Sequence, residues 1–348
     1  MIQEMELELA VSAHKTINDI LKVAPEETLL ITIDSSGDFR LAAAMARAGE
    51  CAGAKTMIAY HSTAPAYGKA GEWRLPDCLS GAIERADIWI ELNEVWLYCN
   101  TAWEKAMGEG TKTRYFHLGK MDPDSLWRCL GALDLPALKR FMTAVANMTR
   151  ASTEVRMTNP AGTDISFKNA ERPVTNECGD ASTPGVHFML GQIGWAPLER
   201  SIEGEIVFDA SFHGGGSMDL GILRHPIKYV VEKGKIIDIV GQQEAKRVAE
   251  WLAGLNDERM YRLAHTCYGF NPGAKLTGKC TEDERIWGCT QWGFGYQAAV
   301  FKGALGDAVS HGDGICLNSS VWLDDVQLLD AGRVVHPELV ELAGQLRK

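Results

Sequence analysis

The sequence lacks the features that mark secreted, membrane-spanning and nucleic-acid-binding proteins. Its first ten residues are acidic and contain neither a basic segment nor an uninterrupted apolar run, so no secretory signal is expected. No stretch approaches the about 18 apolar residues of a membrane-spanning helix. The net charge is −11 and no cluster of five or more Lys and Arg occurs, which argues against a nucleic-acid or anionic-membrane surface. We expect a cytoplasmic protein whose partners are small molecules, with no nucleic acid and no membrane among them.

Paired cysteine motifs and phosphate-binding fingerprints are also missing. The 9 cysteines are odd in number, scattered and without a Cys-x-x-Cys pair, which fits reduced thiols that pack as small apolar side chains. The one loop that resembles a phosphate site, Asp34-Ser-Ser-Gly-Asp38, has a single glycine and two acids. It therefore predicts a helix-capping loop more readily than a dinucleotide site, although a helix N-terminus also attracts anions.

The first part of the chain alternates between strand-like and helix-like segments. With 348 residues and 46% hydrophobic content, the chain is long enough for two cores, and we place the boundary between domains 1–150 and 151–348. Alternation predicts an α/β N-terminal domain with a mainly parallel sheet. The expected strands are residues 28–33, 55–60, 86–92 and 114–118, with a helix over 39–53.

The second part is richer in strands and turns. It predicts a mixed α+β C-terminal domain with strands at residues 154–158, 163–167, 204–208, 227–231 and 236–240, and a helix over 243–253. Glu232-Lys-Gly-Lys235 has the length and the glycine of a hairpin turn. His213, beside the Gly214–Gly216 run, is expected in a loop.

The candidate metal ligands are His265, His311 and Asp313. In an extended segment residues i and i+2 share a face, so His311 and Asp313 can bind one ion, and His265 can complete the set. With 9 His and 46 acidic residues, roughly one Asp or Glu two places after a His is expected by chance, so the spacing only nominates the site. The alternative is a hydrogen-bonded histidine on a strand.

Longer motifs carry a family resemblance. They are Gly162-Thr-Asp164, Gly191-Gln-Ile-Gly-Trp-Ala-Pro197, Glu203-Gly-Glu-Ile-Val-Phe208, His265-Thr-Cys-Tyr-Gly-Phe-Asn-Pro272 and His311-Gly-Asp313. The series resembles the thermophilic metallo-aminopeptidase superfamily and, within it, most closely the 2,5-dihydroxypyridine 5,6-dioxygenase branch. The likeness runs over most of the chain and is strongest from Ala151 onward.

The departures from the peptidase pattern are informative. That pattern implies a two-metal site, yet this chain has Gln192 where the first Glu stands, His265 at the second Glu and Gln291 at a His. A neutral amide is a poor ligand beside a carboxylate or an imidazole, so a second divalent ion is not expected. Two His and one carboxylate leave open coordination positions, which suits Fe(II) oxygen chemistry better than structural zinc.

The resemblance implies a mononuclear Fe(II) enzyme that opens a hydroxylated N-heteroaromatic ring with dioxygen, giving an N-formyl amic acid. His187 stands at the position of a pocket histidine of that branch and is our candidate base, since an imidazole titrates near neutrality. A second pocket histidine of the branch is absent here, and Tyr98 is the candidate to supply a hydroxyl instead. This difference leaves the identity of the ring open.

The remaining pocket candidates are amides and aromatics. Gln192 and Gln291 are candidates to read ring oxygens, with structural amides as the alternative. Trp195, Trp292, Phe294 and Tyr296 are candidates for an aromatic wall, and each is as well explained by the core.

Two other functions stay open at this stage. A single Zn²⁺ on the same three ligands would suit hydrolysis of an amide, imide or peptide bond, with Glu177 or Glu205 as base. A binding protein that kept the fold without catalysis is the third possibility. Self-association into a homo-oligomer is expected from the resemblance.

Overall fold

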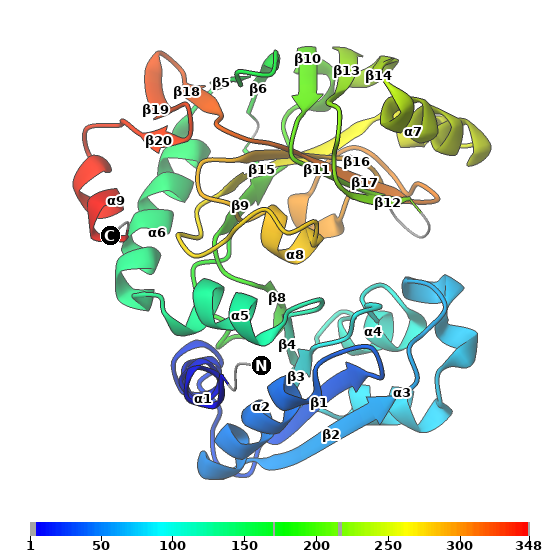
Figure 1. Ribbon diagram of the computed structural model, residues 1–348, viewed down its shortest axis with the longest axis vertical. Helices are drawn as coiled ribbons and strands as arrows, with labels where there is room; N and C mark the ends of the chain where they lie inside the picture. The colour runs from blue at the N-terminus through cyan, green and yellow to red at the C-terminus, as the bar shows by residue number, and fades with distance from the viewer. Residues whose placement is uncertain (1–4, 170, 215–217, 347–348) are drawn as a thin grey trace. The chain divides into compact units, whose positions relative to one another are not determined.

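The computed structural model of the protein describes residues 5–169, 171–214 and 218–346 (Figure 1). The chain forms two compact units, one of Met1–Leu133 with Gly179–Leu190 and one of Asp134–Cys178 with Gly191–Lys348. The α-helices are α1 (Glu6–His14), α2 (Phe39–Cys51), α3 (Asp77–Ile83), α4 (Thr101–Ala106), α5 (Pro123–Leu126), α6 (Leu135–Ala151), α7 (Gln243–Gly254), α8 (Cys280–Asp283) and α9 (Val340–Leu346). Among the described residues, no helix combines the length and apolarity that crossing a membrane requires.

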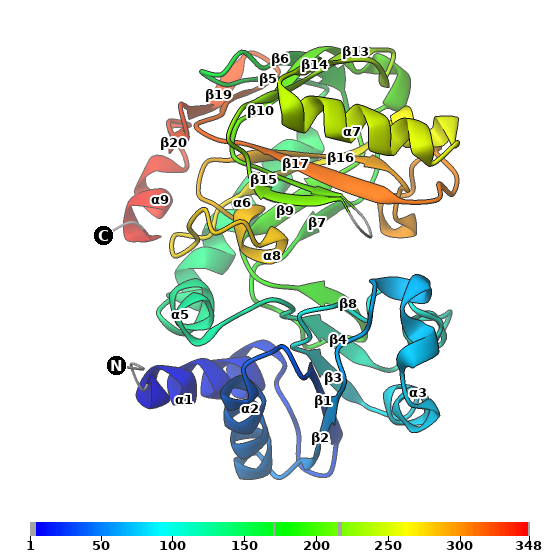
Figure 2. The same ribbon diagram turned by 45° about the vertical axis from the view of Figure 1, so that its right-hand side comes forward.

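The first unit is built on a five-stranded parallel sheet of order β2-β1-β3-β4-β8. Its strands are β1 (Thr28–Asp34), β2 (Lys55–His61), β3 (Ile88–Glu91), β4 (Arg114–His117) and β8 (Gly185–Phe188). Helices α1 and α2 lie on one side of the sheet and α3 on the other (Figure 2). The expected parallel, helix-covered sheet is thus present.

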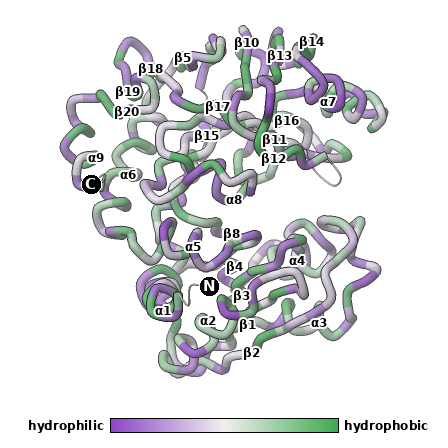
Figure 3. Tube along the Cα trace, viewed as in Figure 1, coloured by the Kyte–Doolittle hydropathy of each residue, from purple (hydrophilic) through white to green (hydrophobic). Residues whose placement is uncertain are grey.

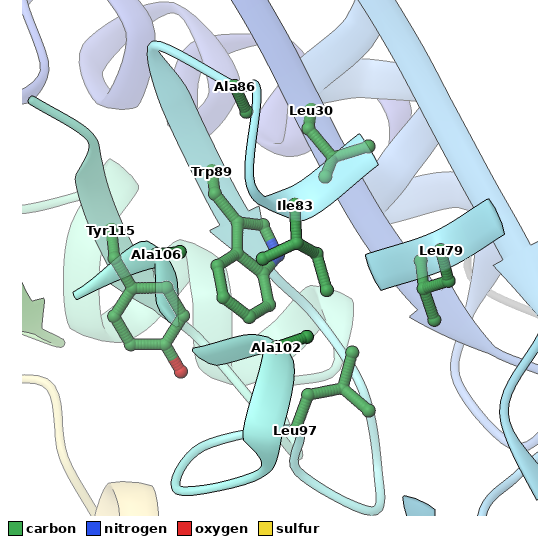
Figure 4. Packing of buried hydrophobic residues seen from close by; sticks show 9 residues of the cluster. All are labelled: Leu30, Leu79, Ile83, Ala86, Trp89, Leu97, Ala102, Ala106 and Tyr115. Atoms are coloured by element: carbon green, nitrogen blue, oxygen red, sulfur yellow. The ribbon is translucent and has the colours of Figure 1, made fainter. Parts of the chain in front are cut away.

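A buried apolar cluster joins α3 and α4 to this sheet. Leu79 and Ile83 of α3 and Ala102 of α4 pack with Trp89 of β3 and Tyr115 of β4 (Figure 4). Trp89 and Tyr115 are fully buried, and their ring centroids lie 4.6 Å apart. Burial of such large aromatic surfaces stabilises the unit and fixes the ends of β3 and β4.

The loop after β1 caps a helix, as the sequence predicts. Asp38 accepts a hydrogen bond from the backbone N–H of Arg40 at the start of α2. Asp34 accepts from the backbone N–H groups of Ser36 and Gly37. The two carboxylates therefore satisfy backbone donors of the loop and of the first turn of α2.

The second unit contains two mostly antiparallel sheets. One has eight strands in the order β14-β13-β10-β6-β5-β18-β19-β20, and the other has seven in the order β12-β11-β17-β16-β15-β9-β7. The strands are β5 (Glu154–Thr158), β6 (Asp164–Lys168), β7 (Val174–Asn176), β9 (Gln192–Trp195), β10 (Glu203–Phe208), β11 (Ser211–Gly214), β12 (Asp219–Ile222), β13 (Ile227–Glu232), β14 (Lys235–Gly241), β15 (Leu263–Gly269), β16 (Thr290–Gly295), β17 (His311–Cys316), β18 (Ser320–Leu323), β19 (Val326–Asp330) and β20 (Arg333–Val334).

Aromatic side chains fill the space between the two sheets. Phe167 of β6 contacts Trp292 of β16 edge-on at 5.3 Å between centroids, and Tyr229 of β13 meets Phe294 of β16 at 5.6 Å. All four side chains are buried. One face of the seven-stranded sheet therefore packs in a dry core, and functional side chains can lie only on its other face.

The two long helices of this unit are amphipathic. Hydrophobic and hydrophilic residues alternate in colour along α6 and α7 (Figure 3). The buried residues of α7, Ala245, Val248 and Leu252, follow the helical period and so share one face. The helix predicted at residues 243–253 is confirmed.

Most predicted strands and the hairpin are confirmed within one or two residues, including the β13–β14 turn at Lys233-Gly234. The loop predicted for His213 is wrong, because His213 lies buried on β11 and pairs with Asp219 of β12 at 2.7 Å. Residues 215–217 of the glycine run lie outside the described residues. A domain boundary after residue 150 stays a prediction.

Candidate metal centre

Neighbouring strands of the seven-stranded sheet bring His265, His311 and Asp313 to one face. His311 and Asp313 lie two residues apart on β17, and β16 separates this strand from β15, which carries His265. The register places Gly293 of β16 opposite both His265 and Asp313. Directly opposed residues share a face, so the three side chains converge above Gly293.

The three side chains form a compact donor set. Asp313 Oδ1 lies 3.5 Å from His265 Nε2, and both Asp313 oxygens lie 3.2 Å from His311 Nε2. The imidazole rings are nearly parallel, with centroids 5.2 Å apart. One donor atom from each residue falls within 4.8 Å of the others. Two imidazoles and a carboxylate at this separation fit a single divalent ion with open coordination positions.

Hydrogen bonds and stacking set the orientation of the two imidazoles. His311 Nδ1 donates to the backbone carbonyl of Tyr296 at 2.8 Å, which directs Nε2 toward Asp313. His265 stacks on Phe301 at 5.1 Å, and its buried Nδ1 has no hydrogen-bond partner among the described residues. The nitrogen that faces the Asp313 carboxylate is Nε2, 3.5 Å from Oδ1, so Nε2 is the atom through which His265 can bind an ion.

Gly293 makes the close approach of His265 possible. A Cβ at this position would lie 2.1 to 2.7 Å from atoms of the His265 ring, far inside contact distance. Any other residue would push the imidazole away from Asp313. A glycine inside a strand commonly marks such a close approach, and this is the sequence feature from which its role could have been inferred.

The protonation states favour metal binding at His265 and Asp313. Burial lowers the pKa of His265 to about 4, so its imidazole is neutral at physiological pH. Burial alone would raise the pKa of Asp313, but the charge of His311 and its hydrogen bond outweigh this and hold the pKa at about 2. Burial opposes protonation of His311 too, yet the Asp313 carboxylate raises its pKa. A cation would displace the proton that these two residues share.

A buried polar network continues from Asp313. Gln291 Nε2 donates to Asp313 Oδ1 at 2.6 Å, and Gln192 Nε2 donates to Gln291 Oε1 at 2.7 Å. Two residues that follow α8 also bind this network: Glu284 accepts from both amides, and Arg285 donates to Gln192. Sequence reasoning nominated Gln192 and Gln291 but missed Glu284 and Arg285, whose only sign in the sequence is an acidic run ending in Arg at residues 282–285.

The aromatic candidates divide between two environments. Trp195 and Trp292 both stand opposite Thr266 in the register, one residue out of phase with His265, and so lie on the core face of the sheet. They are 2% and 0% exposed. Tyr296 directly follows β16, and its backbone carbonyl holds His311. Tyr296 therefore stays a candidate for the substrate pocket, whereas the two tryptophans are placed as core residues.

His187 and Tyr98 belong to the first unit. His187 lies on β8, where Nε2 donates to the backbone carbonyl of Thr183 at 2.8 Å and burial lowers its pKa. Tyr98 precedes α4, half-buried, with its ring 5.6 Å from that of Phe188. The structure therefore gives each residue an ordered place within this unit.

The first unit also holds a buried polar chain that sequence reasoning did not single out. The Tyr115 hydroxyl donates to Glu91 and lies 3.1 Å from His117 Nδ1. Burial and the Glu91 charge raise the pKa of Tyr115 well above its usual value. Glu91 and His117 occupy the carboxyl ends of β3 and β4, the edge of a parallel sheet where side chains of different strands meet.

The acids considered as bases for a hydrolase are differently placed. Glu205 lies on β10 of the eight-stranded sheet and pairs with Lys228 at 2.9 Å. Glu177 follows β7, and its backbone N–H donates to the Gln192 carbonyl at 2.9 Å. Among the described residues, neither carboxylate belongs to a cluster of possible metal ligands.

The chain is similar to known proteins over most of its length. The model of a family described as 2,5-dihydroxypyridine 5,6-dioxygenase matches residues 11–336. The curated 2,5-dihydroxypyridine 5,6-dioxygenase of Pseudomonas putida KT2440 is 27% identical over 271 residues, covering 74% of this chain and 73% of the relative.

Solved structures show the same fold. A 2,5-dihydroxypyridine dioxygenase from Pseudomonas putida KT2440 has a TM-score of 0.77 at 21% identity, covering 95% of this chain and 98% of that one. Wild-type AmpT from Thermus thermophilus has a TM-score of 0.66 at 14% identity, covering 94% and 99%. The resemblance that the motifs carry is confirmed, and the chain belongs to the 2,5-dihydroxypyridine 5,6-dioxygenase family.

Proposed function

We propose that the protein is a ring-opening dioxygenase that acts on a hydroxylated N-heteroaromatic ring of the 2,5-dihydroxypyridine class. The observation that carries the proposal is the convergence of His265, His311 and Asp313 in a member of this family. We further propose that these three residues hold Fe(II). The finer expectations of cytoplasmic location and homo-oligomerisation also stay proposals.

The types of the three ligands favour iron. Two imidazoles and one carboxylate leave several coordination positions open, and such a set is typical of Fe(II) oxygen chemistry. When bound, Fe(II) supplies a path for electrons between an electron-rich ring and dioxygen. The burial of His265 and Asp313 keeps bulk water from competing strongly at their side of the site.

A base that removes a phenolic proton makes the ring a better electron donor, and we propose His187 for this role. Its Nε2 donates to Thr183, so Nδ1 is left as the acceptor, and the lowered pKa keeps the imidazole neutral and able to take a proton. We propose Tyr98 as a hydroxyl that positions the ring. Gln192, Gln291 and Tyr296 are the proposed pocket residues of the second unit, which also carries the metal ligands.

The test is the metal dependence of oxygen uptake. Anaerobically purified protein would be reconstituted with Fe(II) or Zn(II) and assayed with 2,5-dihydroxypyridine while dissolved oxygen is recorded. We expect uptake with Fe(II) only, and its loss in His265→Ala. Arg156→Gln, on an exposed strand residue paired with Asp164, is the matched control and should behave as the wild type. Turnover with Zn(II) and no oxygen uptake would favour a hydrolase instead.

The roles of the first unit need separate variants. His187→Gln removes the proposed base and keeps a polar side chain of similar size, so we expect kcat to fall by about 100-fold with little change in KM. Tyr98→Phe removes only a hydroxyl, so we expect the larger change in KM. An unchanged kcat in His187→Gln would remove it from the proposal without affecting the metal ligands.

A further inference from the structure

Two charged residues beside the candidate metal centre have no part in the function proposed above. Glu284 and Arg285 directly follow α8 and are 9% and 2% exposed. Arg285 Nη1 donates to Glu284 Oε2 at 2.7 Å. Burying an ion pair costs desolvation energy that its mutual attraction hardly offsets, so such a pair is weakly explained by stability alone. Its neighbours indicate another role.

A hydrogen-bond chain leads from Arg285 to the metal ligand Asp313. Arg285 Nη2 donates to Gln192 Oε1 at 3.1 Å. A guanidinium can only donate, so the oxygen of Gln192 must face it and the amide nitrogen must point away. That nitrogen donates to Gln291 Oε1 at 2.7 Å, which in turn directs the Gln291 nitrogen to Asp313 Oδ1 at 2.6 Å. Arg285 therefore sets the direction of both amides.

Glu284 reinforces the same direction from the other side. Its Oε2 accepts from Gln192 Nε2 at 3.1 Å, and its Oε1 accepts from Gln291 Nε2 at 3.2 Å and from the Cys280 thiol at 2.8 Å. A carboxylate can only accept, so both amide nitrogens are held toward it. Flipping either glutamine would place oxygen against oxygen, and the chain has a single consistent arrangement.

The same contacts occupy a second potential cation position. Donor atoms of Cys280, Glu284 and Asp313 lie within 4.8 Å of one another. The Gln291 nitrogen lies between the two carboxylates, bonded to Asp313 and to Glu284. The guanidinium of Arg285 supplies a positive charge at Glu284. A second ion would have to displace an amide donor and compete with a buried guanidinium.

We propose that Arg285 and Glu284 are positioning residues that fix Gln192 and Gln291, orient Asp313 toward a single metal ion and take the place of a second cation. The proposal rests on the metal centre of the proposed function. It assigns to this chain's own residues the property that one ion, and not two, is bound per chain.

Three substitutions separate the two halves of the proposal. Gln291→Glu keeps the size of the side chain but replaces the donor between Asp313 and Glu284 by an acceptor, so three carboxylates would face one another and attract a cation. Arg285→Gln removes the charge that sets the direction of the amides. Gln192→Leu cuts the chain between Arg285 and Gln291 and leaves both charges in place.

The experiment is a titration of metal-free full-length protein with Co(II), followed by bound metal per chain and by the visible absorption of Co(II), which reports its ligand geometry. We expect one Co(II) per chain in the wild type and two in Gln291→Glu. Arg285→Gln and Gln192→Leu should bind one Co(II) about 10- to 100-fold more weakly with an altered spectrum. Arg156→Gln is the control and should match the wild type, because Arg156 is an exposed side chain of β5 in the eight-stranded sheet.

The outcomes are distinguishable. Wild-type affinity and spectrum in Arg285→Gln and Gln192→Leu, together with a single Co(II) in Gln291→Glu, would overturn the positioning role and leave the metal centre standing. A wild type that binds no Co(II) would overturn the metal centre itself. If circular dichroism shows that Arg285→Gln does not fold, Gln192→Leu and Gln291→Glu decide the matter in the same way.

Discussion

The two faces of the seven-stranded sheet carry opposite kinds of residues, and β16 contributes to both. On one face it presents Gln291 and Gly293, beside His265 and Asp313. On the other it presents Trp292 and Phe294, fully buried against the eight-stranded sheet. Small and polar residues leave room and donors for a ligand, whereas aromatics exclude water. Changes on the first face should therefore cost function, and changes on the second should cost stability.

The largest effect is expected when a donor on the polar face is removed. Asp313→Ala deletes the carboxylate that both histidines face. Loss of a residue that only hydrogen-bonds to a metal ligand lowers metal affinity or activity by up to about 100-fold. Loss of the ligand Asp313 itself should therefore lower metal affinity and kcat/KM each by more than about 100-fold. Metal content and oxygen uptake measure this. If Asp313→Ala keeps its metal and its activity, the polar face of the seven-stranded sheet is not the functional face.

The opposite face is tested by Trp292→Ala. Trp292 is 0% exposed and packs on Phe167, so truncation should lower the free energy of unfolding by about 3–5 kcal/mol. Denaturant unfolding of the metal-free protein measures it. A loss below about 1 kcal/mol would mean that this face is not the tightly packed core described above.

Gly293→Ala sharpens the comparison because it adds one methyl group to the polar face. Its Cβ would overlap the His265 ring, so we expect metal affinity to fall about 10-fold and the free energy of unfolding to fall by about 1–3 kcal/mol. Gly254→Ala is the matched control. Gly254 ends α7, and a Cβ added there would meet no atom within 4 Å apart from its chain neighbours and the helix backbone, so alanine should be neutral or slightly stabilising.

The smallest effect is expected from Trp195→Phe, again on the core face. The indole Nε1 donates to Asn169 Oδ1 at 2.8 Å, and its loss should cost about 1 kcal/mol of stability. Metal affinity should stay unchanged, because Trp195 lies on the side away from His265. A tenfold loss of metal affinity at unchanged stability would place the tryptophan in the pocket after all.

The sequence carries much of the fold because each strand has a local pattern. Thr28–Ile33 consists of aliphatic residues and threonine and forms a buried strand, and Glu232-Lys-Gly-Lys235 has turn chemistry and forms a hairpin. The extended geometry expected for His311-Gly-Asp313 is also found. Membership of β8 in the first sheet depends instead on contacts between distant segments, which no local pattern encodes.

Strand register decides what the sequence leaves open at the site. A shift of one residue in the pairing of β16 would turn Trp292, instead of Gln291, toward the metal ligands. The apolar content of the strand alone does not determine which of the two faces the ligands. Glu284 and Arg285 act through hydrogen bonds to residues 92 to 93 positions away, at Gln192. His213 was misjudged because the glycines beside it favour a loop, while its pairing with Asp219 holds it on a strand.

The central claim is that the protein uses dioxygen to open a hydroxylated ring. The most direct test is to run the Fe(II)-reconstituted enzyme with 2,5-dihydroxypyridine under ¹⁸O₂ and to analyse the product by mass spectrometry. The account predicts an acyclic product that carries both atoms of the labelled dioxygen. A product labelled only from water, or formed equally well without oxygen, would contradict it.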